Sequence, residues 1–151
     1  MGSILLPSNS RQPAGISSDA DRILVVDDEP AVLFAYRRLI EKDGLRVDTS
    51  TDLEDAIRHI RERFYLAVIT DLRLAGTDNG DGLEILRFIR EERPDTKTIL
   101  ATGYADSEIE NMARALGVSH CFKKPVPPAD ILEALRKFHA RRVCPPVAIP
   151  S

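Results

Sequence analysis

The strongest constraint on the fold is a regular alternation of short apolar runs and helical patterns. The clearest runs are residues 23–26, 66–69 and 98–101, with weaker ones at 46–49 and 121–123. Each is followed by a segment whose apolar residues have helical spacing. The runs at 23–26 and 66–69 do not alternate with polar residues, so we expect strands that are buried on both faces. Right-handed crossovers then predict an α/β fold, a doubly wound parallel sheet of five strands with helices on both sides.

Local signals mark where several helices begin and end. Pro30 suits the first turn of the first helix, and Gly44 suits its end. Thr51 and Glu54 have the spacing of a capping box, which predicts that the second helix begins there.

The composition is that of a single globular domain. The chain has 151 residues, of which 43% are hydrophobic and 30% are charged. A net charge of -3 gives no general attraction to nucleic acid, and no apolar run is long enough to span a bilayer. Cys121 and Cys144 lack metal-ligand spacing, so we expect free thiols and a cytoplasmic protein.

The two ends of the chain differ from the alternating part. Residues 1–21 are rich in Ser, Pro, Gly and polar side chains, and we expect a flexible leader. The end, "VCPPVAIPS", predicts a Pro-rich extended tail over residues 143–151. The folded domain is therefore expected over residues 22–142. No DNA-binding or catalytic segment follows the last predicted helix, so we expect action through protein contacts, alone or within a larger protein.

Polar side chains follow four of the predicted strands at the point where each strand ends. Asp27 and Asp28 follow the first strand, Asp71 the third, Thr102 the fourth and Lys124 the fifth. Ligands of open parallel sheets bind beyond the carboxyl ends of the strands, so these residues should meet at one rim. Carboxylate oxygens are ligands that Mg²⁺ prefers, and a cation would offset the repulsion between the three aspartates.

Each of these residues has an ordinary explanation when it is taken alone. An acidic run such as Asp27–Asp28–Glu29 interacts favourably with the start of a helix. An aspartate after a strand is a common turn residue, and a lone lysine is usually exposed. Only their coincidence at four strand ends favours a site.

With these residues in place, the sequence resembles the receiver domains of response regulators, the phosphoacceptor modules of two-component signalling. The motifs "VVDDEP", "AVITDLRL", "ILATGYAD" and "FKKPV" occur in order within residues 22–142. The resemblance implies a flavodoxin-like (βα)5 fold with strand order 2-1-3-4-5. It also implies that Asp71 accepts a phosphoryl group from a histidine kinase or a phosphotransfer protein.

The resemblance assigns roles to the other residues as well. Mg²⁺ would be held by Asp27, Asp28, Asp71 and the backbone carbonyl of Arg73, while Thr102 and Lys124 would contact the phosphoryl group. The chemistry is consistent, because a carboxylate can attack phosphorus once the charge of the incoming group is neutralised. Phosphorylation adds charge and acceptor oxygens, which can bias a helix face between two arrangements.

Two features depart from the usual receiver pattern. The loop "LRLAGTDNGD" is longer than receivers usually show, and Ala75 stands where proline is common. Cys121 occupies the position, three before Lys124, that usually carries Tyr or Phe. Phe122 is adjacent, but it should point to the other side of its strand. Tyr104 lies two residues after Thr102, and we predict that it acts as the switch residue instead.

Three other functions remain open at this point. An Mg²⁺-dependent phosphatase with an aspartyl nucleophile shares the doubly wound fold, but it needs Asp-x-Asp after its first strand and a later acidic pair. A receiver-like interaction module that works without phosphorylation is disfavoured, because all five site residues are present. A nucleotide-binding flavodoxin-like protein would need a Gly-rich phosphate loop, which the sequence lacks.

The resemblance also implies which partners the protein binds. Its partners would be the phosphodonor and a downstream protein target. Direct nucleic-acid binding and membrane insertion are not expected, and the formation of a homodimer is left open. It would be a signalling phosphoacceptor rather than an enzyme, limited to self-phosphorylation from a phosphodonor and self-dephosphorylation.

Overall fold

The computed structural model describes residues 21–72, 74, 81–103 and 107–143. Five parallel strands form one sheet in the order β2-β1-β3-β4-β5. The strands are β1 (Arg22–Val26), β2 (Arg46–Ser50), β3 (Ala67–Asp71), β4 (Lys97–Thr102) and β5 (His120–Lys123). The helices that follow them are α2 (Pro30–Lys42), α3 (Leu53–Glu62), α4 (Asp81–Glu92), α5 (Ser107–Ala115) and α6 (Pro128–Val143). The predicted doubly wound fold and its strand order are confirmed.

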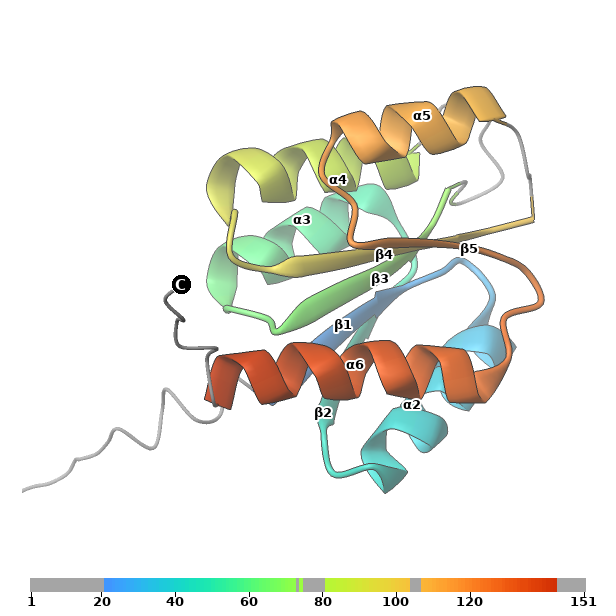
Figure 1. The fold of residues 1–151 in the computed structure, drawn as a ribbon, viewed down its shortest axis with the longest axis vertical. Helices are drawn as coiled ribbons and strands as arrows, with labels where there is room; N and C mark the ends of the chain where they lie inside the picture. Colours follow the sequence, from blue (N-terminus) through green and yellow to red (C-terminus); the bar gives the residue numbers. More distant parts are fainter. Residues whose placement is uncertain (1–20, 73, 75–80, 104–106, 144–151) are drawn as a thin grey trace, which may run out of the picture.

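Helices cover both faces of the sheet, α2 and α6 on one face and α3, α4 and α5 on the other (Figure 1). The interior strand β1 contributes side chains to both layers. Ile23 and Val25 pack in a core cluster with residues of α2 and α6, whereas Leu24 and Val26 pack in a cluster with residues of α3 and α4. All four side chains are at most 1% exposed. Burial on both faces explains why this strand is an unbroken apolar run.

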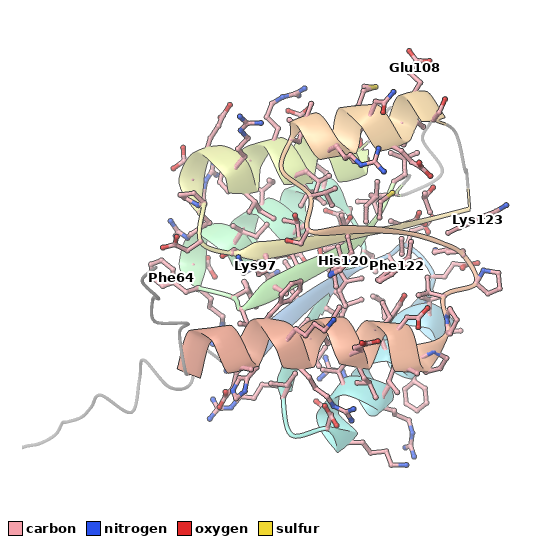
Figure 2. All side chains as sticks on the ribbon, viewed as in Figure 1. Phe64, Lys97, Glu108, His120, Phe122 and Lys123 are labelled. Carbon is pink, nitrogen blue, oxygen red and sulfur yellow. The ribbon has the colours of Figure 1, made fainter. Side chains whose placement is uncertain are left out.

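The edge strand β5 also divides its side chains between two layers. Cys121 packs against the cluster that contains Leu100 and Ala113, and Phe122 packs against the cluster on the α6 side. The ring of Phe122 stacks on His120, and both lie on the α6 side of the strand (Figure 2). Phe122 therefore points away from the layer of Cys121, as the alternation of a strand requires.

The ends of the first helix are as predicted, and the start of the second is not. Pro30 is the first residue of α2, and Gly44 has the positive φ of 93° that glycine adopts most easily. At α3, however, the cap is Asp52, whose carboxylate accepts a hydrogen bond of 2.8 Å from the Asp55 amide. The predicted capping box of Thr51 and Glu54 is therefore wrong by one residue, because Asp52 takes the cap position.

The expected leader and tail fall almost entirely outside the described residues, which begin at Asp21 and end at Val143. Asp21 is tied to the domain, since its carbonyl accepts a hydrogen bond from the Arg46 amide. Its carboxylate lies 2.8 Å from Nε2 of His139 in α6. Among the described helices, none is both long and apolar enough to cross a bilayer.

The strand register brings the carboxyl ends of the central strands to a common edge. Val26 pairs with Thr70, Asp71 with Ala101, and Thr102 with Lys123. The residues that end these strands, or directly follow them, therefore share one rim of the sheet.

Candidate functional site

Three carboxylates converge at this rim. Asp27, Asp28 and Asp71 each offer one carboxylate oxygen, and these atoms all lie within 4.8 Å of one another. Asp27 is only 3% exposed, and the side chain of Asp71 is 17% exposed. Like charges at such distances repel one another, and partial burial weakens the screening by water.

Lys124 supplies the opposite charge. Its Nζ donates to Oδ2 of Asp27 at 2.9 Å and to Oδ2 of Asp71 at 3.1 Å. Burial alone would lower the pKa of the Lys124 ammonium, but the hydrogen bonds and charges of Asp27 and Asp71 outweigh it and raise the pKa. Lys124 supplies one positive charge to a cluster of three carboxylates. The cluster therefore keeps a net negative charge, which a further cation would offset.

The second oxygen of each bonded carboxylate is held by the backbone. Oδ1 of Asp27 accepts from the Glu29 amide at 3.0 Å, and Oδ1 of Asp71 accepts from the Leu72 amide at 2.7 Å. These bonds leave Oδ2 of each residue turned toward Lys124. The backbone thus fixes the orientation of both carboxylates before any ligand binds.

Gly82, near the start of α4, lies directly against Asp71. Its amide donates to the Leu72 carbonyl at 2.9 Å. A Cβ at this position would lie 2.8 Å from Cα of Leu72 and would overlap the carbonyl oxygen of Asp71. Only glycine fits without a shift of the backbone that carries the Asp71 side chain.

Thr102 lies at the end of the neighbouring strand β4 and is 1% exposed. Its carbonyl accepts a hydrogen bond of 2.8 Å from the backbone amide of Lys124, which joins the ends of β4 and β5. The peptide bond between Lys124 and Pro125 is cis. The structure therefore brings together Asp27, Asp28, Asp71 and Lys124, with Thr102 bonded to the backbone of Lys124.

Some predicted features lie outside the described residues. These are Arg73, Ala75 and Tyr104, together with most of the long loop after Asp71. Cys121 is described, and burial raises the pKa of its thiol, with a further contribution from Glu110. It is partly buried and packs against a core cluster as a small apolar residue would.

No motif or spacing in the sequence singles out Gly82 or Tyr36 as site residues. Tyr36 lies in α2 and lines a groove together with Lys124. A helical tyrosine among apolar residues has the pattern of ordinary core packing, and only the packing of α2 beside the end of β5 brings it near the acidic residues. Gly82 is likewise identified by its contact with β3 rather than by any local signal.

Comparison with known proteins agrees with this geometry. The chain matches the family described as response regulator receiver domain over residues 23–136. It is 32% identical over 148 residues to the acid tolerance regulatory protein ActR of Sinorhizobium medicae, an alignment that covers 94% of this chain and 75% of ActR.

Solved structures give the same result. A CheY-like response regulator receiver domain protein from Methanospirillum hungatei superposes with a TM-score of 0.75 at 28% identity, covering 82% of this chain and 96% of that one. The beryllofluoride-activated NtrC4 receiver domain dimer superposes with a TM-score of 0.72 at 27% identity, covering 80% and 97% of the two chains. The fold, the shared rim of polar residues and the family match lead to one conclusion: this chain belongs to the response regulator receiver domain family of two-component signalling.

Proposed function

We propose that the domain is a signalling switch controlled by phosphorylation, and that Asp71 is its single phosphoacceptor. A nucleophilic carboxylate must be reachable and must lie beside a cation that neutralises the incoming phosphoryl group. Asp71 meets both conditions, since its side chain is partly exposed and hydrogen-bonded to Lys124. Asp27 shares Lys124 but is almost fully buried, and Asp28 makes no hydrogen bond to Lys124. The Lys124 bond to a partly exposed Asp71 is the observation that carries the proposal.

The proposed step is transfer from a phosphohistidine or a small acyl phosphate. A carboxylate oxygen of Asp71 forms a bond to phosphorus, while the bond from phosphorus to the leaving group breaks and the leaving group takes the electron pair. Lys124 keeps its proton and donates hydrogen bonds to the phosphoryl oxygens, and the Thr102 hydroxyl donates another. When bound, Mg²⁺ would supply Lewis-acid neutralisation of phosphoryl charge.

The chain has the donors that such an ion needs. Asp27, Asp28 and Asp71 offer three hard oxygen ligands in one cluster, and we assign the backbone carbonyl of Arg73 as a fourth. The single ammonium in the cluster does not balance its carboxylates. Residue types and charge therefore both fit a divalent cation.

The output is a change in protein contacts. Phosphorylation adds about -1.5 to -2 charge and three acceptor oxygens at the end of β3. Thr102 and Lys124 respond to that group, and Tyr104 acts as the aromatic switch in place of Cys121. The phosphodonor is a histidine kinase or a phosphotransfer protein, the target is a downstream protein, and the domain acts in the cytoplasm. A homodimer is part of the proposal, because the activated relative NtrC4 is described as a dimer.

The test is intact-mass spectrometry after incubation with acetyl phosphate and Mg²⁺. We expect one phosphoryl group on the parent chain and none on Asp71→Asn. Asp95→Asn is the matched control, since Asp95 is exposed and precedes β4 at the other end of the strand. Phosphorylation of Asp71→Asn would overturn the assignment, and sustained phosphate release over many turnovers would favour a phosphatase.

A further inference from the structure

Tyr36 lines a mostly aliphatic groove that borders the acidic site. The groove, of about 860 Å³, lies between α2 and residues 124–131. Val32 and Leu39 line it from α2, and Ile131 lines it from α6. Lys124 lines the same groove and also bonds Asp27 and Asp71. The Lys124 side chain is therefore shared by the groove and the acidic site.

The phenol of Tyr36 is placed among the same charges. Its ring is partly buried and packs against the core cluster between α2, α6 and the sheet. Burial raises the pKa of the Tyr36 phenol, Lys124 lowers it, and Asp27 and Asp71 raise it further. A neutral hydroxyl thus lies within electrostatic reach of Lys124 and of two carboxylates. Among the described residues this hydroxyl has no hydrogen-bond partner.

Lys124 has a matching donor. An ammonium carries three N–H groups, and Lys124 uses two of them for its hydrogen bonds to Asp27 and Asp71. Phosphorylation would turn the Asp71 carboxylate into an acyl phosphate, a mixed anhydride, so its carboxyl oxygens would lose their negative charge and Lys124 would turn toward the phosphoryl group. A third partner would then keep the ammonium in place.

We propose that Tyr36 is a positioning residue for Lys124, whose hydroxyl accepts the third N–H of the ammonium when Asp71 receives a phosphoryl group. This proposal rests on the proposed function, because it concerns the reaction of Asp71. Tyr36 then couples the acidic site to the groove between α2 and residues 124–131. The competing explanation is that Tyr36 only packs against the core, in which case its hydroxyl has no part in the reaction.

A double-mutant cycle separates the two explanations, because residues that act through one another are not additive. The rate of phosphorylation by acetyl phosphate with Mg²⁺ is measured for the parent, Tyr36→Phe, Lys124→Met and the double variant. One hydrogen bond of about 1 kcal/mol corresponds to a slowing of about fivefold, which we expect for Tyr36→Phe. In the Lys124→Met background Tyr36→Phe should cause no further slowing. Phe34→Leu, an exposed residue of the same helix, is the control and should keep the parent rate.

An equal slowing by Tyr36→Phe in both backgrounds, or none in the parent, would overturn the proposal. Tyrosine fluorescence gives a second measurement if Lys124→Met reacts too slowly, since the chain contains no tryptophan. Beryllofluoride with Mg²⁺ should change the emission of the parent more than that of Tyr36→Phe, and equal changes would again contradict the proposal. If the parent itself accepts no phosphoryl group, the proposed function fails instead.

Discussion

Lys124 is the residue on which the electrostatics of the site depend. Its ammonium bonds two of the three clustered carboxylates, and a divalent cation would compete with it for these carboxylates. Lys124→Gln should therefore lower the free energy of unfolding in EDTA by about 1–3 kcal/mol, because the carboxylates lose a charged hydrogen-bond donor. Millimolar Mg²⁺ should stabilise this variant more than it stabilises the parent. Thermal melts with and without Mg²⁺ measure both effects.

Lys123→Gln is the control for this experiment, because Lys123 is adjacent, exposed and directed into solvent (Figure 2). It should leave both melting temperatures unchanged. A loss in Lys124→Gln that is the same with and without Mg²⁺ would contradict competition for the carboxylates.

The residues at the site differ in how far the sequence could predict them. Asp27, Asp71, Thr102 and Lys124 each end or follow a strand, so the strand pattern alone was enough to gather them at one rim. Tyr36 could not be predicted in this way. Tyr36 and Lys124 line one groove because α2 lies beside the start of α6, and no spacing along the chain predicts that arrangement.

At the scale of elements, the junction between β3 and α4 determines where Asp71 lies. Gly82→Ala would force its new methyl group into the Asp71 carbonyl, so the end of β3 must shift. We expect a loss of about 1–3 kcal/mol in stability and slower phosphorylation, although alanine normally favours a helix. Urea unfolding and the acetyl phosphate reaction measure the two effects.

Gly103→Ala is the matched control for that substitution, since a Cβ at Gly103 would meet no atom within 4 Å. It should be tolerated in both assays. Equal behaviour of the two alanine variants would show that the close approach at Gly82 has no bearing on Asp71.

The turn before β3 carries a buried tyrosine that ties it to β2. The Tyr65 hydroxyl donates to Oδ2 of Asp48 at 2.7 Å, and Tyr65 is 1% exposed. Burial, together with the hydrogen bond and charge of Asp48, raises the pKa of the Tyr65 phenol above its ordinary value of 10.0. The folded state therefore keeps this proton at a pH where the unfolded chain loses it, so its contribution is complete below about pH 10 and declines as the pH rises further.

Tyr65→Phe should cost about 1–2 kcal/mol at neutral pH. The stability difference between the parent and Tyr65→Phe should shrink above about pH 10, because only the parent loses the contribution of this hydroxyl. Urea denaturation of both proteins at neutral and alkaline pH tests this. Other groups that titrate at alkaline pH contribute equally to both free energies of unfolding, so they cancel in the difference. A difference that is constant with pH would rule out the Tyr65 proton as the cause.

Element boundaries show the limits of sequence patterns at this scale. The weaker runs at 46–49 and 121–123 lie within β2 and β5, so even these short strands could be placed. The start of α3 was misplaced because Thr51 and Asp52 are both competent caps. The path of the chain as it leaves β2 decides between them, and that path is a tertiary property.

For the whole molecule, the alternation of strands and helices was enough to predict a doubly wound sheet. Runs without polar alternation identified the strands buried on both faces, and β1 indeed packs in two core layers. The order of the strands in the sheet could not be predicted from this alternation. Local patterns do not encode which strands are neighbours, and the order 2-1-3-4-5 came from the resemblance to receiver domains before the sheet confirmed it.

At the scale of the whole molecule, the proposed function requires that Asp71, and no other carboxylate at the rim of this sheet, accepts the phosphoryl group. Borohydride reduces an acyl phosphate to an alcohol, so a phosphorylated aspartate becomes homoserine. After reaction with acetyl phosphate and Mg²⁺, reduction and peptide mass mapping should find homoserine at position 71 only. Homoserine at position 27 or 28, or none in protein whose intact mass shows a phosphoryl group, would contradict the account.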